Sequence, residues 1–147
     1  MGFHENKMLE VKRQRPGTMR LVDATQYRLP LAGVVSILHR ASGAMMFALL
    51  PLVIWLFDTS VTSEISFEVF RSAFGAGIGW VPGWFVKLAV LGLIWAYLHH
   101  FIAGVRHLWM DATHSVTKEF GRQSAVVTLV LSVLLTVALG AKLFGLY

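Results

Sequence analysis

The chain has 147 residues, 56% of them hydrophobic and 14% charged, and its mean hydropathy is +0.63. This composition excludes an ordinary soluble globule of this size and indicates a membrane protein. Because there is no cysteine, disulfides, thiolate zinc sites, iron–sulfur ligation and c-type haem attachment are also excluded. The net charge of +5 indicates membrane orientation rather than nucleic-acid binding, since the basic residues gather beside apolar runs.

The chain is expected to divide into a polar N-terminal arm, residues 1–30, and a membrane domain, residues 31–147. The arm carries six Lys and Arg residues, and its Pro16-Gly17 pair argues against one continuous helix. No short apolar stretch precedes a small-residue cleavage site, so we expect no removable signal peptide. The stretch Arg13-Gln14-Arg15-Pro16 is expected to lie on a partner or on lipid headgroups.

The first membrane span is expected over residues 31–57, opened by Pro30 at a position where a helix does not use the backbone N–H. Ser36 and Arg40 lie one turn apart on one face of this span, and His39 lies to one side. An arginine inside a span is costly unless it meets an anion, a carbonyl or a polar cavity. Arg40 is therefore read either as reaching toward the headgroups or, together with Ser36, as lining a polar cavity.

A loop over residues 58–81 separates the first two spans. Phe67, Phe70 and Phe74 recur at a spacing of three and four residues, and glycines follow from Gly75 onward. This spacing predicts a short amphipathic helix that lies on the membrane surface and ends at the glycines.

The second span is expected over residues 83–110 and the third over residues 125–145. Pro82 suits the start of the second span. A short polar loop with Lys118 and Arg122 joins the two spans. The third span carries no strong polar feature and is interpreted as a scaffold.

The second span ends in the polar stretch of the chain that most strongly indicates a site. At ~100° per residue, His100, Gly104, His107 and Asp111 share one stripe of the helix, whereas His99 points elsewhere. The stripe places an imidazole beside the small residues Ala103 and Gly104, which leaves room for a flat macrocycle next to a potential metal ligand. The alternative is that His100 only hydrogen-bonds a neighbouring helix and that the two small residues allow close helix packing.

The distribution of Lys and Arg predicts the orientation. The arm and the last loop carry eight, against three in the first loop and the adjacent span ends. The amino terminus is therefore expected in the cytoplasm and the carboxyl terminus on the opposite side. In this orientation Arg40 and Arg106 both lie toward the cytoplasmic half, so the two polar stretches can face each other.

Two segments carry a resemblance to a known family. Ser36-Ile37-Leu38-His39-Arg40-Ala41-Ser42-Gly43 and the stretch from His100 to Asp111 resemble the two signature motifs of the cytochrome b membrane-anchor subunits of bacterial succinate dehydrogenase, respiratory complex II. The motifs read S-x-x-H-R-x-S-G and H-x-x-x-G-x-R-H-x-x-x-D. The arm and the three-span length also match, so the similarity covers nearly the whole chain.

The resemblance implies an all-α, integral membrane fold of three transmembrane helices with a polar N-terminal arm, forming half of a heterodimeric anchor bundle. His100 matches the residue that ligates the iron of haem b, with the other axial ligand coming from a second anchor subunit. His39 and His107 match contacts of the haem propionates. Arg106 and Gly104 belong to the same cofactor-binding set.

The resemblance also implies a ubiquinone pocket lined by Ser36 and Arg40 near the cytoplasmic face. A quinone carbonyl that gains electrons needs hydrogen-bond donors and a fixed positive charge nearby. The implied partners are a flavoprotein subunit, an iron–sulfur subunit and the second hydrophobic anchor, in the inner membrane of a bacterium. The chain would pass electrons from the iron–sulfur subunit to quinone, in the tricarboxylic acid cycle and respiratory chain, and do no succinate chemistry itself.

Two other functions stay open on the sequence. One is the anchor of a fumarate reductase that uses menaquinone, because the motifs do not set the direction of the reaction. The other is a purely structural membrane subunit or a small transporter subunit, in which the histidines pack or relay protons without haem. An absorption spectrum separates the last possibility from the first two.

Overall fold

In a computed structural model, residue 22 and residues 28–147 are described. The predicted arm over residues 1–30 therefore falls almost entirely outside the described residues, including Arg13-Gln14-Arg15-Pro16. The described part of the chain is helical, with one isolated β-bridge between Ile78 and Val81. Its helices, in chain order, are α2 (Leu31–Ala48), α3 (Leu50–Val61), α4 (Glu64–Gly75), α5 (Gly83–Thr113) and α6 (Lys118–Leu143).

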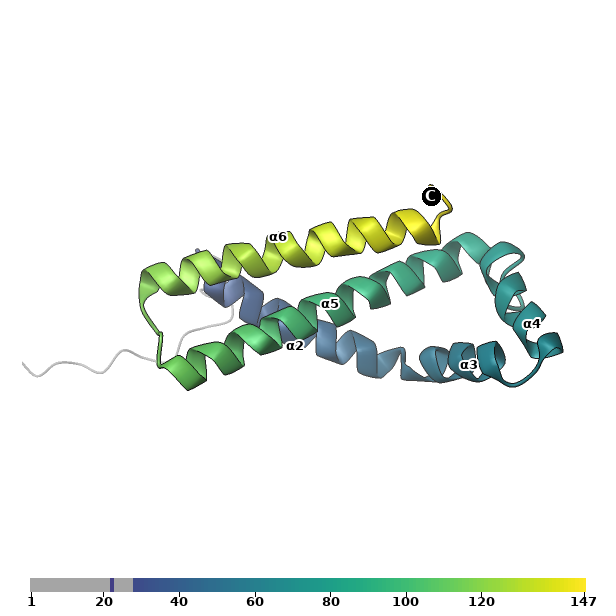
Figure 1. Cartoon of the computed structure of the whole chain (residues 1–147), viewed down its shortest axis with the longest axis horizontal. Coiled ribbons are helices and arrows are strands. Elements are labelled where there is room, and N and C mark those ends of the chain that lie inside the picture. Colours follow the sequence, from purple (N-terminus) through teal and green to yellow (C-terminus); the bar gives the residue numbers. More distant parts are fainter. Residues whose placement is uncertain (1–21, 23–27) are drawn as a thin grey trace, which may run out of the picture.

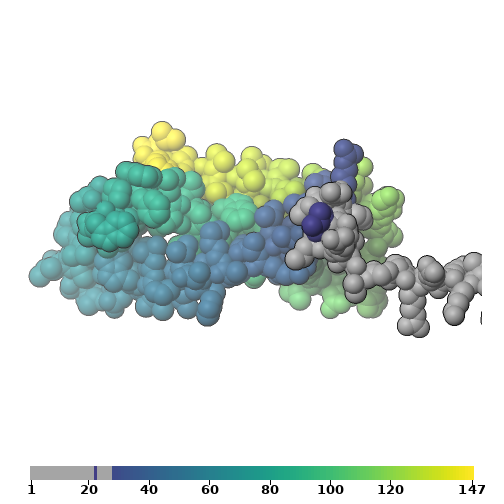
Figure 2. Space-filling model, turned by 180° about the vertical axis from the view of Figure 1, so that it is seen from behind, coloured from purple at the N-terminus to yellow at the C-terminus, as the bar shows by residue number. Residues whose placement is uncertain are grey.

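Three of these helices form the membrane bundle. Helices α5 and α6 run antiparallel side by side, and α2 crosses them (Figure 1). Seen from behind, α2 and α3 lie across the α5–α6 pair (Figure 2). Helices α2, α5 and α6 are each long and apolar enough to cross a membrane. The predicted all-α fold with three membrane spans is confirmed.

The first predicted span is not one helix, which corrects the prediction for residues 31–57. Helix α2 ends at Ala48, Leu49 has φ −93° and ψ 6°, and α3 begins at Leu50. The cause is Pro51, which has no N–H to donate to the carbonyl of Phe47 four residues earlier. The chain therefore bends after α2, and α3 leads on to α4.

The other two spans are longer than predicted at their polar ends. Helix α5 begins at Gly83 as expected and continues to Thr113, where His114 takes a left-handed conformation with φ 52°. Helix α6 begins at Lys118, well before residue 125, because the Thr117 hydroxyl accepts a hydrogen bond from the Phe120 N–H at 3.2 Å. Both helices thus extend beyond their apolar segments.

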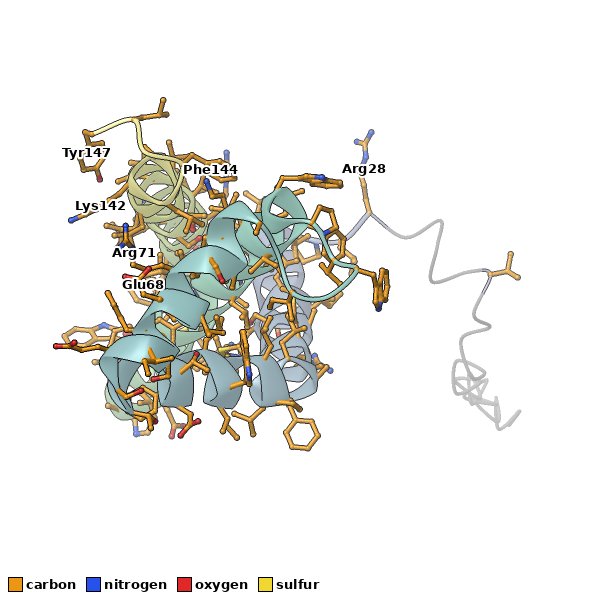
Figure 3. The ribbon with its side chains drawn as sticks, turned by 90° about the vertical axis from the view of Figure 1, so that its right-hand side faces the viewer. Arg28, Glu68, Arg71, Lys142, Phe144 and Tyr147 are labelled. Atoms are coloured by element: carbon orange, nitrogen blue, oxygen red, sulfur yellow. The ribbon has the colours of Figure 1, made fainter. Side chains whose placement is uncertain are left out.

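The predicted amphipathic helix between the first two spans is confirmed as α4. Ser63 caps it, because its side chain accepts from the Ser66 N–H at 3.1 Å and the Ser66 hydroxyl accepts from the Ser63 N–H at 2.9 Å. Its polar face carries the Glu68–Arg71 ion pair at 3.1 Å. Figure 3 shows this pair and Lys142 of α6 on the same side of the molecule, and Figure 1 shows α4 and the end of α6 at the same end.

Two glycines allow the tight corner between α4 and α5. Gly77 has φ +106°, a conformation that side chains rarely adopt, and a Cβ there would also clash with the Val81 carbonyl. A Cβ on Gly83 would clash with the Gly75 carbonyl. The corner therefore requires glycine at both positions, and it fixes where α5 enters the bundle.

The centre of the bundle is thin and made of small side chains. Val35 of α2, Ala103 of α5 and Ala125 of α6 are buried together, and Leu129 packs against them. Small residues let helix backbones approach closely where lipid removes most of the hydrophobic drive for association. Close approach of the helices brings the polar side chains of α2 and α5 within contact distance.

Candidate functional site

Helices α2 and α5 bring three imidazoles together. The ring of His39 stacks on that of His100, with 4.1 Å between centroids and 17° between planes. The ring of His107 lies 5.3 Å from that of His39, tilted by 54°. The expectation that the two polar stretches face each other is confirmed by these contacts, and we call these three residues the histidine cluster.

The ring of His100 is held by hydrogen bonds to α2. Its Nδ1 lies 2.9 Å from the carbonyl oxygen of His39 and 3.3 Å from Oγ of Ser42, and the Ser42 hydroxyl also donates to that carbonyl at 2.9 Å. Because a carbonyl can only accept, this geometry assigns the proton of the neutral ring to Nδ1. Nε2 then carries a free lone pair, and no described residue hydrogen-bonds to it. An imidazole oriented through Nδ1 in this way is the usual form of a metal ligand.

Two glycines shape the histidine cluster. A Cβ on Gly43 would lie 2.9 Å from Cε1 of His100, whereas a Cβ on Gly104 would lie 3.6 Å from Nε2 of His39. Gly43 is thus the residue that makes room for the ring of His100. The ring of His39 lies over Gly104, and room for a macrocycle beside Gly104 stays a prediction.

Ser36 and Arg40 lie together on the outer face of α2, as predicted. A terminal guanidinium nitrogen of Arg40 donates to Oγ of Ser36 at 3.4 Å. Arg40 is exposed and Ser36 is half-buried. Within the described ranges no carboxylate pairs with Arg40, since the ion pair found there is Glu68–Arg71. Both side chains can therefore donate hydrogen bonds to a ligand that approaches this face.

Arg106 lies on another side of α5. Its Nε donates to Oγ of Ser124 at 2.9 Å and a terminal nitrogen donates to the Gly121 carbonyl at 3.2 Å, so that it packs against α6. Among the described residues, no hydrogen bond joins Arg106 to the histidine cluster. Its place in the cofactor-binding set stays a prediction.

His99 also faces α6, in accordance with the prediction that it points away from the His100 stripe. It is fully buried, with Nδ1 3.3 Å from Oγ of Ser132 and its ring stacked on Trp95 at 5.4 Å. The sequence analysis did not identify Ser42 or Ser132 as the residues that hold the two histidines. Helix periodicity does not predict which histidine either serine contacts, because that depends on how the helices cross.

The donor set fits a metal carried inside a cofactor rather than a bare ion. In the part of the chain that the structure describes, no three His, Asp or Glu side chains converge in a way that could hold a metal ion. The histidine cluster instead offers one anchored imidazole with a free nitrogen and two further imidazoles beside it. Such a set can supply one axial ligand to a macrocycle and polar contacts to its edge.

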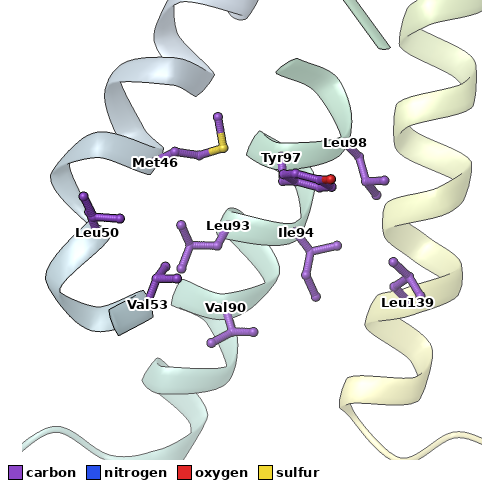
Figure 4. Close-up of a pocket in the computed structure, with 9 residues that line it drawn as sticks. All are labelled: Met46, Leu50, Val53, Val90, Leu93, Ile94, Tyr97, Leu98 and Leu139. Carbon is purple, nitrogen blue, oxygen red and sulfur yellow. The ribbon is translucent and has the colours of Figure 1, made fainter. Parts of the chain in front are cut away.

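An apolar cavity of about 460 Å³ lies in the other half of the bundle (Figure 4). It contains no acid, base or other charged side chain, and Tyr97 supplies its one hydroxyl group. It therefore does not fit a ligand that needs charge stabilisation. Its walls are Met46, Leu50, Val53, Val90, Leu93, Ile94, Tyr97, Leu98 and Leu139.

The fold defines a class: a membrane subunit of three spans, whose helices bring three histidines together. The profile of a family described as "Succinate dehydrogenase/Fumarate reductase transmembrane subunit" matches residues 13–139. The chain belongs to this family, and the resemblance found in its motifs is confirmed.

Several relatives share the name "Succinate dehydrogenase cytochrome b556 subunit". The protein of Paracoccus denitrificans is 33% identical over 111 residues, covering 76% of this chain and 80% of the relative. That of Coxiella burnetii is 34% identical over 119 residues, covering 81% and 90%. That of Rickettsia typhi is 23% identical over 130 residues, covering 88% and 94%.

Proposed function

We propose that this chain is a cytochrome b anchor subunit of a succinate:quinone oxidoreductase, which binds haem b and passes electrons from an iron–sulfur partner to ubiquinone. The observation that carries the proposal is the ring of His100, fixed through Nδ1 with Nε2 free, inside a cluster of three histidines. The names of the relatives, which call them cytochrome b556 subunits, support the same cofactor.

In this proposal Nε2 of His100 would hold the iron of haem b, together with a residue of the second anchor subunit. His39 and His107 contact the propionates, whose negative charges need polar partners in a medium of low dielectric constant. The bound haem would supply a one-electron carrier. The chain's own contribution is to hold Nε2 toward the iron, through the bonds of Nδ1 to His39 and Ser42.

Quinone is proposed to bind on the outer face of α2, at Ser36 and Arg40. Both side chains present donors, and the guanidinium of Arg40 has no carboxylate beside it within the described residues. A quinone oxygen that gains electrons becomes negative, and a fixed positive charge stabilises it. The partner subunits must bring the iron–sulfur clusters, because the chain has no cysteine. They are also proposed to bring the flavin, because the chain has no dinucleotide fingerprint.

The proposed location is the inner membrane of a bacterium, with the amino terminus in the cytoplasm. Its support is the bias of eight Lys and Arg against three, with the loop between α5 and α6 on the same side as the start of α2. Ser36 and Arg40 then lie in the cytoplasmic half, where a soluble iron–sulfur partner can reach them.

The test is a reduced-minus-oxidised spectrum of the complex purified through a tag on this chain. The unaltered complex is expected to show b-type bands, and His100→Leu to lose them because the iron loses its ligand from this chain. His99→Gln, a change at the neighbouring position, is expected to keep them. Copurification of the partner subunits in each variant separates loss of haem from loss of assembly. Unchanged bands in an assembled His100→Leu complex would overturn the proposal.

A further inference from the structure

Arg106 is a cation buried between α5 and α6. It is 8% exposed, and its guanidinium bonds to two neutral groups, the Ser124 hydroxyl and the Gly121 carbonyl. No carboxylate of the described residues reaches it. A guanidinium has five N–H donors, so part of its donor capacity stays open. A charge at such depth in a membrane protein is costly unless it meets an anion.

The open side of Arg106 leads into a groove between α5 and α6. This groove has a volume of about 400 Å³. It is lined by Arg106, by apolar side chains that include Val105, Trp109 and Val127, and by the polar residues Gln123, Ser124 and Thr128. Val105, Trp109 and Val127 are 49%, 61% and 61% exposed, so the groove opens on the outer surface of the bundle. It combines one cation with walls that suit hydrocarbon.

The groove lies near the end of the two helices. Arg106 precedes the last residue of α5, Thr113, by seven positions, and Gly121 follows the first residue of α6, Lys118, by three. Seven residues of helix span about 10 Å. A guanidinium at that depth lies within reach of the boundary between lipid headgroups and acyl chains, where tryptophans such as Trp109 are also common.

We propose that the α5–α6 groove binds one anionic phospholipid. Its phosphate accepts hydrogen bonds from the guanidinium of Arg106, and an acyl chain lies against Val105, Trp109 and Val127. A planar guanidinium matches phosphate oxygens in a bidentate manner. Basic pockets between spans on the cytoplasmic side are suited to acidic headgroups. This site lies on the α6 side of α5, apart from the histidine cluster, and it does not depend on haem or quinone.

The test uses the whole complex, stripped of lipid in mild detergent and placed in nanodiscs that contain phosphatidylglycerol and phosphatidylcholine. Native mass spectrometry counts the lipids that stay bound. The unaltered complex is expected to retain phosphatidylglycerol about tenfold in preference to phosphatidylcholine, as charge pairing at a partly buried site predicts. Arg106→Gln is expected to reduce this preference to about twofold or less, because it removes the charge. Arg106→Lys is expected to keep part of it.

Two further variants make the test specific. Arg122→Gln removes an exposed cation at the same end of α6 and is expected to keep the preference. Val127→Trp fills the groove from its exposed side without touching the guanidinium, and is expected to lose the bound lipid. If Arg106→Gln does not assemble, Val127→Trp alone tests whether the groove binds the lipid. Millimolar inorganic phosphate is expected to leave the lipid in place, and displacement would mean a site for free phosphate and reject the proposal.

The proposal fails if the unaltered complex retains both lipids equally, or if Arg106→Gln or Val127→Trp leaves the preference intact. The b-type spectrum is recorded on the same samples. An assembled Arg106→Gln complex with unchanged lipid and altered haem bands would assign the guanidinium to the cofactor instead. Because the lipid count does not use the haem bands, either proposal can fail without the other.

Discussion

His99 and His100 are neighbours in the sequence but lie in two different helix–helix interfaces of the bundle, which we call the α5–α6 seam and the α2–α5 seam. His100 belongs to the α2–α5 seam, where Nδ1 is bonded and Nε2 is free at a half-buried position. His99 belongs to the α5–α6 seam, where it is fully buried between Trp95 and Ser132. A ligand can reach the first imidazole, whereas the second is enclosed by its own chain. The comparison supports the proposal that the α2–α5 seam carries the cofactor, whereas the contacts of the α5–α6 seam hold the helices together.

The largest difference in haem binding between the two seams is expected when one methyl group is added to a glycine of each. In Gly43→Ala the new Cβ lies 2.9 Å from Cε1 of His100, whose ring is fixed by hydrogen bonds and cannot retreat. Overpacking of this kind costs about 1–3 kcal/mol, so the affinity for haem is expected to fall about 5- to 150-fold, and the haem content per complex to fall with it. The measurement is the reduced-minus-oxidised spectrum normalised to protein.

The control for Gly43→Ala is Gly140→Ala in the α5–α6 seam. Its Cβ would lie even closer to a neighbour, 2.7 Å from Cδ1 of Leu91, but that atom is the end of a flexible side chain. Haem content is therefore expected to stay normal. Equal loss of haem in both variants would show that any crowding of the bundle expels the cofactor, and would remove the distinction between the seams.

The second prediction concerns the outer face of α2. Arg40→Leu removes the fixed charge proposed to stabilise the reduced quinone, so quinone reduction is expected to fall about 10²- to 10³-fold. Reduction of a water-soluble dye by succinate should change little, because the dye takes electrons before they reach the membrane. The assays are the two activities of one purified complex.

Arg71→Leu provides the control for Arg40→Leu. Arg71 is an exposed arginine of α4, paired with Glu68. Both activities are expected to persist in that variant. A parallel loss of both activities in Arg40→Leu would instead indicate a defect of assembly, and would take Arg40 out of the quinone site.

The sequence predicts these seams only in part. The opposition of His99 and His100 follows from rotation along a helix, as does the shared face of Ser36 and Arg40. The same rotation groups Arg106 with His99 rather than with His100, and the structure agrees with that grouping, although the resemblance links Arg106 to the haem. Periodicity within one helix is thus a reliable guide to which face a residue takes.

What periodicity does not predict is which residues meet between helices. Ser42 and Gly43 contact His100 because of the angle and register at which α2 crosses α5. Neither the angle nor the register can be predicted from the sequence of one helix alone. The bend after α2 had a local signal in Pro51, but a proline in a span can also be accommodated without a break. The length of the apolar run does not predict this bend.

The third prediction addresses the α5–α6 seam through stability. Ser132→Ala removes the hydroxyl beside Nδ1 of His99, a side chain that is fully buried. Leaving this nitrogen without its serine partner in a buried position is expected to lower stability by about 1–3 kcal/mol. Thermal unfolding of the complex measures this loss, and the haem spectrum is expected to stay normal. Loss of haem without loss of stability would place His99 in the cofactor site.

The smallest effect is expected from the corresponding serine of the α2–α5 seam. Ser42→Ala removes one contact of His100 Nδ1, but the carbonyl of His39 remains at 2.9 Å, so the ring keeps its orientation. Three contacts join His100 Nδ1, the Ser42 hydroxyl and the His39 carbonyl, and only the one between Nδ1 and the carbonyl is kept. Stability is therefore expected to fall by only about 0.5–1.5 kcal/mol.

The more informative measurement on Ser42→Ala is the haem potential. A partner that polarises Nδ1–H makes the imidazole a stronger ligand and favours oxidised iron. Redox titration of Ser42→Ala is therefore expected to give a raised potential with haem content close to normal, whereas Ser132→Ala leaves the potential unchanged. A shift of potential in Ser132→Ala, with none in Ser42→Ala, would mean that the α5–α6 seam, and not the α2–α5 seam, faces the haem.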